Sequence, residues 1–596
     1  MQMKSTASRV ILSAFVVAAT IVPVFPQTTS STSADEVKAL KEQLASQQKQ
    51  IDQLQRALED QKQLLQAIQV SHGGQTKETA TQQGTANGQA PESPSLGEVA
   101  SLAPVIPAGA PTAAAAPTAA AAPMTTTVAS PQETPESPLQ LRVGTAYITP
   151  VAFMDFTGVY RSRTGGSGIG TNFGSIPYGN TAYQSNLSEF RLSMQNSRIG
   201  FRVDADVKGS HVIGYMEADF LGNNPGNVAV SSNSNTFRSR LYWVDVRKNS
   251  WEVLGGQTWS LITPGRTGIS PLPGNLFYTQ DIDVNYQAGE VWGRIPEFRF
   301  VYHHNDKAAF AFAIDSPEQY IGGSAGGGVV TFPPTLPTYP GAQLNNGGTT
   351  LAVPNVAPDF IAKLAFDPVS KFHFEFGGIL REFKLWNPPA NTGYPTATYS
   401  ATGGGGFLNL NFELFKGFRI DTNNYWSDGG GRYIFGQAPD LIARADGSPS
   451  LIHSGSTVSG FEYTHKNTIL YAYYGGIYIN RNFAVVPVTT TSGTPPVTTT
   501  TLTPFGYGYH GSSSGQNRSI QEPTFGFAQT FWKDAKYGAL TFMFQYSYLT
   551  RNPWYVSSAS PCPATISSAS CPSNASLNMV FFNLRYTLPG SAPAIR

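Results

Sequence analysis

The chain has 596 residues, of which only 13% are charged, and it contains 59 Gly and 27 Tyr. This composition is typical of strands, turns and interfacial aromatic residues, and it favours an all-β fold. The 39 basic and 38 acidic side chains leave a net charge of +1, so no overall field concentrates polyanions and we expect no nucleic acid partner.

Residues 1–26 are expected to form an export signal. Lys4 and Arg9 precede an apolar run from residue 10 to about residue 25, which is too short for a comfortable membrane helix. The cleavage site is expected somewhere between residues 20 and 34. Further along the chain no run of about eighteen apolar residues recurs, so any membrane-spanning structure must consist of strands.

A heptad repeat follows in residues 34–70. Ser33 and Glu36 have the spacing of a capping box, and two glycines end the pattern, which predicts one helix of about 50 Å. A stripe this narrow needs partner helices, so we expect a coiled coil, with a solitary amphipathic helix as the alternative. The apolar side chains lie three and four residues apart, at Val37, Leu40, Leu44, Ile51, Leu54, Leu58, Leu65 and Ile68.

Residues 71–140 are rich in Ala, Pro, Thr, Ser and Gln, and they include APTAAAAPTAAAAP at 110–123. Such a segment cannot bury enough apolar area to fold. We expect it to be a disordered tether that separates the coiled coil from the rest of the protein.

From 141 to 588 the sequence alternates between apolar and polar residues, in runs separated by Gly, Asn and Pro clusters. This pattern is typical of an outer-membrane β-barrel, followed here by a tail at 589–596. We predict sixteen antiparallel strands near residues 149–161, 188–206, 210–221, 237–247, 250–260, 296–304, 307–315, 357–367, 371–383, 405–416, 417–426, 456–465, 468–479, 521–533, 537–550 and 576–588.

The connections between these strands alternate in length. Tight turns such as Lys208-Gly209 follow the even-numbered strands, whereas every odd-numbered strand is followed by about fourteen residues or more. Short turns on one side and long loops on the other are usual in outer-membrane barrels, with both termini in the periplasm. A soluble β-sandwich and a trimeric adhesin are the alternatives, but the first lacks so many aromatics on one strand face and the second usually contributes only a few strands per chain.

The sequence contains no catalytic motif of the GxSxG, HExxH or P-loop kind, and its eight histidines are scattered. We therefore expect neither an enzyme nor a cofactor. Cys562 and Cys571 lie in one Pro- and Ser-rich stretch, which predicts a small disulfide in an exported protein, with two free thiols as the alternative. Their spacing and the lack of nearby His exclude a metal site there.

In a barrel, function depends on the inward-facing residues, because fixed charges in a narrow bore select solutes. Alternation along the strands assigns charged side chains of both signs to the lumen. Arginines suit bidentate contact with carboxylates, so they would either pass small anions along the wall or brace the wall by pairing with neighbouring acids. The predicted pore-lining residues are Arg191, Arg198, Arg202, Asp204, Glu217, Arg299, Arg381 and Arg419.

The third long loop, about 261–295, is expected to fold into the bore and narrow it. Our hypothesis is that its acids face an arginine-bearing wall and set a transverse field, whereas the alternative is a surface loop with solvated charges. The predicted constriction residues are Arg266, Asp281, Asp283, Glu290 and Arg294.

The barrel region also resembles the DcaP-like porins. The resemblance rests on five motifs in the family's order, namely SRIGFRV (197–203), GGQTWSLI (255–262), GRIPEFRF (293–300), DSPE (315–318) and DGGGRYIFG (428–436). It implies a homotrimer with a periplasmic coiled coil, which would then be three-stranded, and a channel for small, often anionic, organic solutes. It also favours Arg202, Arg299 and Arg381 as bore residues. The chain departs from the family in its insertions at 324–356 and 486–518 and in its non-aromatic C-terminal end.

The sequence thus predicts a passive outer-membrane porin for small hydrophilic solutes, in contact with outer-membrane lipid and inserted by the barrel-assembly machinery. The alternative is a structural anchor, in which the coiled coil and the tether contact the cell wall and link the envelope together.

Overall fold

The computed structural model describes residues 139–589 except 167, 178–185, 277–278, 324–326, 348–352, 495 and 556–574. The expected export signal, the coiled coil and almost all of the tether and the C-terminal tail lie outside these residues, as do Cys562 and Cys571. Within the described part, no helix has the length and hydropathy needed to cross a membrane.

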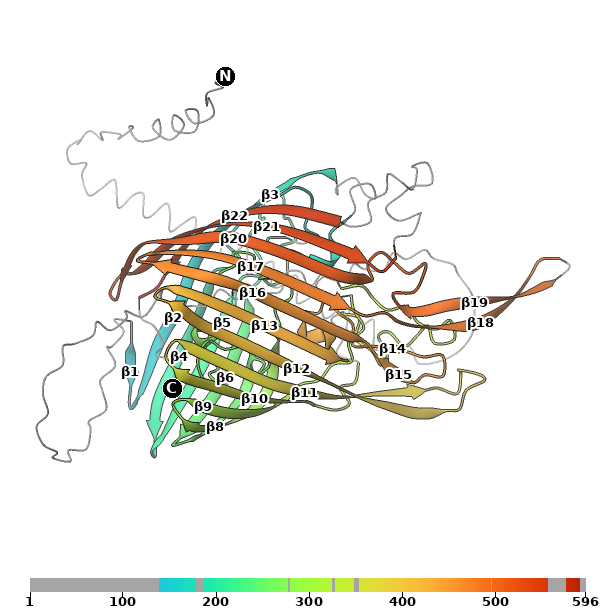
Figure 1. Cartoon of the computed structure of the whole chain (residues 1–596), viewed down its shortest axis with the longest axis horizontal. Coiled ribbons are helices and arrows are strands. Elements are labelled where there is room, and N and C mark those ends of the chain that lie inside the picture. Colours follow the sequence, from blue (N-terminus) through green and yellow to red (C-terminus); the bar gives the residue numbers. More distant parts are fainter. Residues whose placement is uncertain are drawn as a thin grey trace, which may run out of the picture. The chain divides into compact units, whose positions relative to one another are not determined.

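Sixteen antiparallel strands form a closed barrel, which confirms the predicted barrel and its strand number. The barrel closes where β2 (Ala146–Arg161) pairs with β22 (Ala575–Thr587). Neighbouring strands follow one another in chain order (Figure 1). Between β2 and β22 they are β4 (Arg198–Val207), β5 (Ser210–Asp219), β6 (Arg238–Lys248), β7 (Trp251–Trp259), β8 (Arg294–Asn305), β9 (Ala308–Asp315), β10 (Asp359–Val369), β11 (Phe372–Asn387), β12 (Ala397–Phe415), β13 (Phe418–Asp428), β16 (His453–His465), β17 (Thr468–Ile479), β20 (Asn517–Asp534) and β21 (Gly538–Pro553).

The second barrel strand is broken, although we predicted it as continuous over 188–206. β3 (Glu189–Ser193) and β4 both pair with β2, and a turn at 194–197 separates them, closed by a hydrogen bond from the Ser197 amide to the Met194 carbonyl at 3.0 Å. A short β1 (Leu141–Val143) pairs with the start of β2. These two pieces explain why the hydrogen-bonded sheet counts eighteen strands around a barrel of sixteen.

The connections alternate between short turns and long loops, as predicted. In the turn between β4 and β5, Lys208 and Gly209 both have positive φ, 51° and 75°, the backbone that lets a two-residue hairpin follow the strand twist. One long loop is shorter than expected, at residues 388–396, because β11 and β12 extend beyond their predicted ends. Two long loops contain hairpins, β14 (Leu441–Ala443) with β15 (Pro449–Leu451), and β18 (Asn482–Ser492) with β19 (Val497–Tyr507).

Alternate residues on each strand face opposite sides of the wall. In β10, Ile361 and Lys363 are buried inside the barrel, whereas Phe360 and Leu364 are half-buried on the outside. Large apolar side chains elsewhere on the outer surface are strongly exposed, such as Met154 at 63% and Phe298 at 56%. An apolar exterior this large would be costly in water, so the outer surface suits a hydrocarbon environment.

Candidate pore constriction

The loop between β7 and β8, residues 260–293, folds into the barrel. On the side of β10 and β11 its backbone contacts charged wall residues. The Gly265 amide donates to Glu375 at 3.1 Å, and Lys363 donates to the Thr263 carbonyl at 2.6 Å. Bonds to wall side chains satisfy loop backbone groups that have no strand partner, so this part of the loop is fixed.

Further along, the same loop reaches the wall formed by β17, β20 and β21. The Gln280 amide donates to the Tyr473 hydroxyl at 2.9 Å, and the Ile282 amide donates to Gln545 at 2.7 Å. The Ala288 amide donates to Glu522 at 2.8 Å. Because β10 and β20 are well separated around the barrel, these contacts show that the loop crosses the bore.

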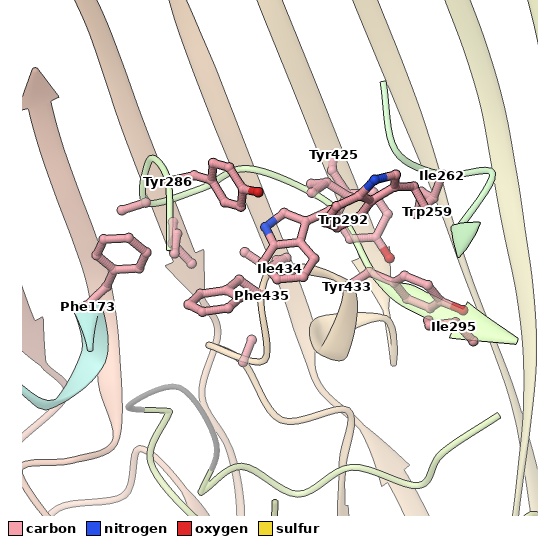
Figure 2. Close-up of a cluster of buried hydrophobic side chains, with 14 of the residues drawn as sticks. Phe173, Trp259, Ile262, Tyr286, Trp292, Ile295, Tyr425, Tyr433, Ile434 and Phe435 are labelled. Carbon is pink, nitrogen blue, oxygen red and sulfur yellow. The ribbon is translucent and has the colours of Figure 1, made fainter. Parts of the chain in front are cut away.

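An aromatic layer lies at the centre of this crossing (Figure 2). The rings of Trp292 and Phe435 stack with centroids 4.9 Å apart, and Trp259 and Tyr286 meet Trp292 edge-on at 5.5 and 5.8 Å. Phe435 belongs to the loop that follows β13 and begins with the 3-10 turn η5 (Gly431–Tyr433). The Trp292 amide donates to the Tyr433 carbonyl at 3.0 Å, so the layer joins two loops within the barrel.

Two of these aromatic residues have an unfavourable backbone. Tyr286 and Phe435 have φ values of 66° and 48°, in the left-handed region that bulky residues rarely adopt. Each costs of order 1–3 kcal/mol and persists only where the surroundings impose it. Both rings pack against Trp292, so their surroundings hold a strained arrangement in the middle of the bore.

A basic wall lies beside the aromatic layer, on β4 to β6. Arg240 binds Glu217 at 2.8 Å and Asp219 at 2.7 Å. Arg198 binds Glu217 at 3.3 Å, and Arg238 binds Asp219 at 2.9 Å. Arg294, one of the predicted constriction residues, starts β8 and lies over the Trp259 ring at 5.5 Å. The wall thus gathers four guanidinium groups around two carboxylates.

The other predicted pore-lining arginines each have a partner. Arg202 binds Asp204, which is also predicted to line the pore, at 2.5 Å. Arg299 binds Glu297 at 2.5 Å. Arg381 binds Asp359 at 3.0 Å and Asp440 at 2.8 Å, and Arg419 donates to Asn411. Arg191 lies on β3, binds Glu189 at 3.1 Å and is half exposed. Except for Arg419, whose partner is an amide, these arginines pair with acids, which is one of the two alternatives that the sequence leaves open.

The acids of the loop gather on the side of β20 and β21. Asp281 accepts from the Thr279 hydroxyl at 2.5 Å, and Asp283 accepts from the Asn285 amide at 2.9 Å. Burial, and to a lesser extent the nearby Asp283 carboxylate, together raise the pKa of Asp281 to about 7. Burial also raises the pKa of Asp283 and, together with Asp281, that of Glu290. The three acids are therefore crowded and poorly solvated. The positive charge of Arg161 on β2 partly offsets the effect of burial on the pKa of Asp283.

The hypothesis places acidic loop residues against a basic wall, but Arg266 shows the reverse charges. It reaches the wall and binds Glu462 on β16 at 3.0 Å, where Tyr473 also donates to the same carboxylate at 2.9 Å. Nearby Glu462 raises the pKa of the Arg266 guanidinium. Here a basic loop residue pairs with an acidic wall residue. The loop therefore carries charges of both signs, and not only acids.

Several residues of this region were not selected from the sequence, namely Arg161, Arg240, Glu462, Glu522 and the aromatic layer. For Arg161 a signal existed, because it shares the inward parity of the predicted strand 149–161. For Arg240 the parity is shifted by a β-bulge between Glu217 and Ala218. Among the described residues, no group of three or more His, Asp or Glu is arranged to hold a metal ion.

Comparisons with known proteins find structural but not sequence relatives. No family model matches the chain, and no curated protein matches it. The outer membrane channel DcaP of Acinetobacter baumannii superimposes with a TM-score of 0.50 at 13% identity, over 74% of this chain and 97% of that one. The anion-selective porin from Comamonas acidovorans gives 0.39 at 10% identity, over 74% and 100% of the two chains, and OmpT of Vibrio cholerae gives 0.38 at 10%, over 75% and 99%. The likeness to DcaP shows a porin-like barrel fold.

Proposed function

We propose that this protein is a passive, non-enzymatic channel in the bacterial outer membrane for small hydrophilic, anionic organic solutes. The observation that carries the proposal is a closed barrel with an apolar exterior and a charged interior. Such a wall is stable only with lipid outside and polar groups or water inside. The fold-level likeness to an outer-membrane channel supports the same reading.

The preference for anions rests on the basic wall. Arg198, Arg238, Arg240 and Arg294 surround only two carboxylates, so the wall keeps an excess of positive charge in a poorly screened space. Within the described part of the chain, two guanidinium nitrogens of Arg198, Nε and Nη2, are buried and make no hydrogen bond. Buried donors of this kind favour a carboxylate or another small anion as partner.

We further propose that the protein assembles as a homotrimer, with the N-terminal coiled coil of residues 34–70 in the periplasm. The heptad repeat and the family resemblance support this assembly, and the barrel-assembly machinery would insert the chain. Single-channel recording of the purified protein in a planar bilayer tests the proposal. We expect openings in groups of three and, under a salt gradient, a reversal potential that indicates anion preference. A silent membrane despite verified insertion would reject the channel.

A second candidate function is a structural anchor that ties the outer membrane to the cell wall through the coiled coil and the tether. The aromatic layer favours it, because several buried rings occupy the middle of the bore. Deleting residues 35–70 separates the two functions. A channel keeps its single-channel conductance after the deletion, whereas an anchor loses its role, which would appear as a leaky envelope in cells that produce the shortened protein.

A further inference from the structure

Two exposed arginines share one tryptophan at the long-loop end of the barrel. Arg481 follows β17, and Arg518 lies near the start of β20. Their guanidinium carbons lie 5.6 and 5.9 Å from the centre of the Trp554 ring. Like charges repel, so holding two guanidinium groups around one ring costs free energy that cation–π contact offsets only in part.

Trp554 is held in a fixed position. Its indole N–H donates to the Ile479 carbonyl at 3.0 Å, and its amide donates to the Gln516 carbonyl at 3.0 Å. A Cβ added to Gly508 would lie 2.8 Å from both the Trp554 ring and the Arg481 side chain. Because Gly508 also has a positive φ of 76°, a glycine is needed for the chain to pack this closely. The tryptophan ring is therefore held in a fixed position between its backbone contacts, and both arginines lie close to it.

The Trp554 ring lies on the outer side of the wall. Trp554 packs against Tyr478 with ring centroids 6.3 Å apart, and Tyr478 is 42% exposed on the outward parity of β17, between the buried Ile477 and Ile479. β17, β20 and β21 are neighbours, and the β18–β19 hairpin leaves from the same end (Figure 1). The arginines are thus at the rim, not in the bore.

No carboxylate in the described part of the chain forms an ion pair with either arginine. The sequence explains this, because residues 481–521 contain no Asp or Glu, and neither do residues 552–578. The first acid after Arg518 is Glu522, which faces the interior and is 1% exposed. Two cations on segments without acids of their own are an unbalanced charge that a ligand can neutralise.

We infer that Arg481, Arg518 and Trp554 form a binding site for a phosphate group, supplied by the phosphorylated lipid headgroups that surround the barrel rim. The inference rests on the proposed membrane location, in which the long loops face outward. A guanidinium fork matches the oxygens of a phosphate, and both guanidinium groups lie close to the same ring, 5.6 and 5.9 Å from its centre. The ring itself lies at the interfacial level, where tryptophans are enriched.

The test compares an R481Q/R518Q variant with a K466Q/K536Q control, in which two exposed lysines are removed from the short-turn end. Each purified barrel is mixed with phosphatidylcholine vesicles that contain bis-phosphorylated lipid A, and lipid A retained after detergent extraction is quantified by mass spectrometry. We expect about tenfold less retention for R481Q/R518Q than for the wild type and the control, because the variant loses both charge-assisted contacts to the phosphate. Equal retention by all three proteins would overturn the inference.

Two further arms identify the source of the phosphate. Lipid A stripped of its phosphates should bind the wild type as weakly as the variant, whereas equal binding with and without phosphates would overturn the inference in favour of contact with the acyl chains. If inorganic phosphate displaces lipid A from the wild type, the site binds the phosphate group of the lipid. If inorganic phosphate saturates the site while lipid A does not bind there, the site belongs to the free ion and the lipid source is overturned. Conductance in pure phosphatidylcholine bilayers is measured in parallel, so failure of the lipid site and failure of the channel are distinguishable.

Discussion

Trp292 and Phe435 stack with their ring centroids 4.9 Å apart, although they come from loops that follow β7 and β13. Both are nearly buried, at 5% and 8% exposed. Together with the hydrogen bond from the Trp292 amide to the Tyr433 carbonyl, this contact connects the loop that crosses the bore with a second inward loop. Apolar constrictions control ion flow because water and ions enter them reluctantly, so we expect the stacked pair to act as a barrier in this barrel.

Replacing Trp292 with Ala should therefore raise single-channel conductance, by roughly twofold or more, because the ring at the centre of the layer is removed. Trp426→Ala is the matched control, since that tryptophan is 53% exposed on the outside of the wall. The measurement is conductance in a planar bilayer at fixed salt. If the Trp292 variant has the same conductance as the wild type, ions do not pass through the aromatic layer and must take another path through the barrel.

Phe435 allows the strain and the ring to be separated. Phe435→Ala and Phe435→Gly both remove the ring, but only Gly adopts a φ of 48° freely. The Gly variant should therefore be about 1 kcal/mol more stable than the Ala variant. Unfolding in urea, followed by the mobility shift of unheated barrels, measures the difference. A less stable Gly variant would show that the positive φ is not under strain in the folded protein.

The pairing of Arg266 with Glu462 predicts a large loss of stability on breaking it. Arg266→Gln leaves a carboxylate only 7% exposed without its cation, which costs about 3 kcal/mol. Adding Glu462→Gln should recover part of this loss, because the unpaired charge is removed as well. Protease cleavage within residues 260–293 reports release of the loop. A double variant as sensitive as Arg266→Gln alone would show that the pair does not hold the loop.

The sequence predicted the barrel well because the side-chain period of a strand is two. Once Ile199 and Phe201 are assigned to lipid, Arg198 and Arg202 must face inward, and the structure places both there at 2% exposed. Parity fails where the ladder is irregular. The bulge at Glu217 moves Arg240 into the basic wall, and no spacing in the sequence marks that bulge.

The constriction was predictable only in part, because it depends on contacts between distant segments. The sequence identified the inward loop, but Trp292 meets Tyr433 and Phe435 only through folding of a second loop. The motif DGGGRYIFG contains Tyr433 and Phe435, but the motif alone indicates a family resemblance and not a contact with Trp292. Ion pairs across the wall cannot be predicted from strand alternation either. Alternation predicts that Arg381 faces inward, but it does not predict that Asp359 and Asp440 neutralise its charge.

Replacing Asp281 and Asp283 with Asn tests the transverse-field hypothesis. Both acids are buried in the loop that crosses the bore, so removing their negative charge should shift the reversal potential towards anions when it is recorded at pH 8, where Asp281 is largely ionised. Asp306→Asn is the control, because that acid is exposed in a short turn. Identical reversal potentials for the double variant and the wild type would remove these acids from the selectivity filter.

Asp281 also predicts a pH dependence near neutrality. Burial and the nearby Asp283 raise its pKa from 3.8 to about 7, so the folded protein holds a proton that the unfolded chain has already released. Its contribution to stability is therefore complete below pH 4 and lost as pH rises through about 7. In the channel, ionisation adds a negative charge beside Asp283, Glu290 and Glu522, so cation preference should increase with a midpoint near pH 7. Asp281→Asn should flatten that titration, and a midpoint that persists in the variant would assign it to another group.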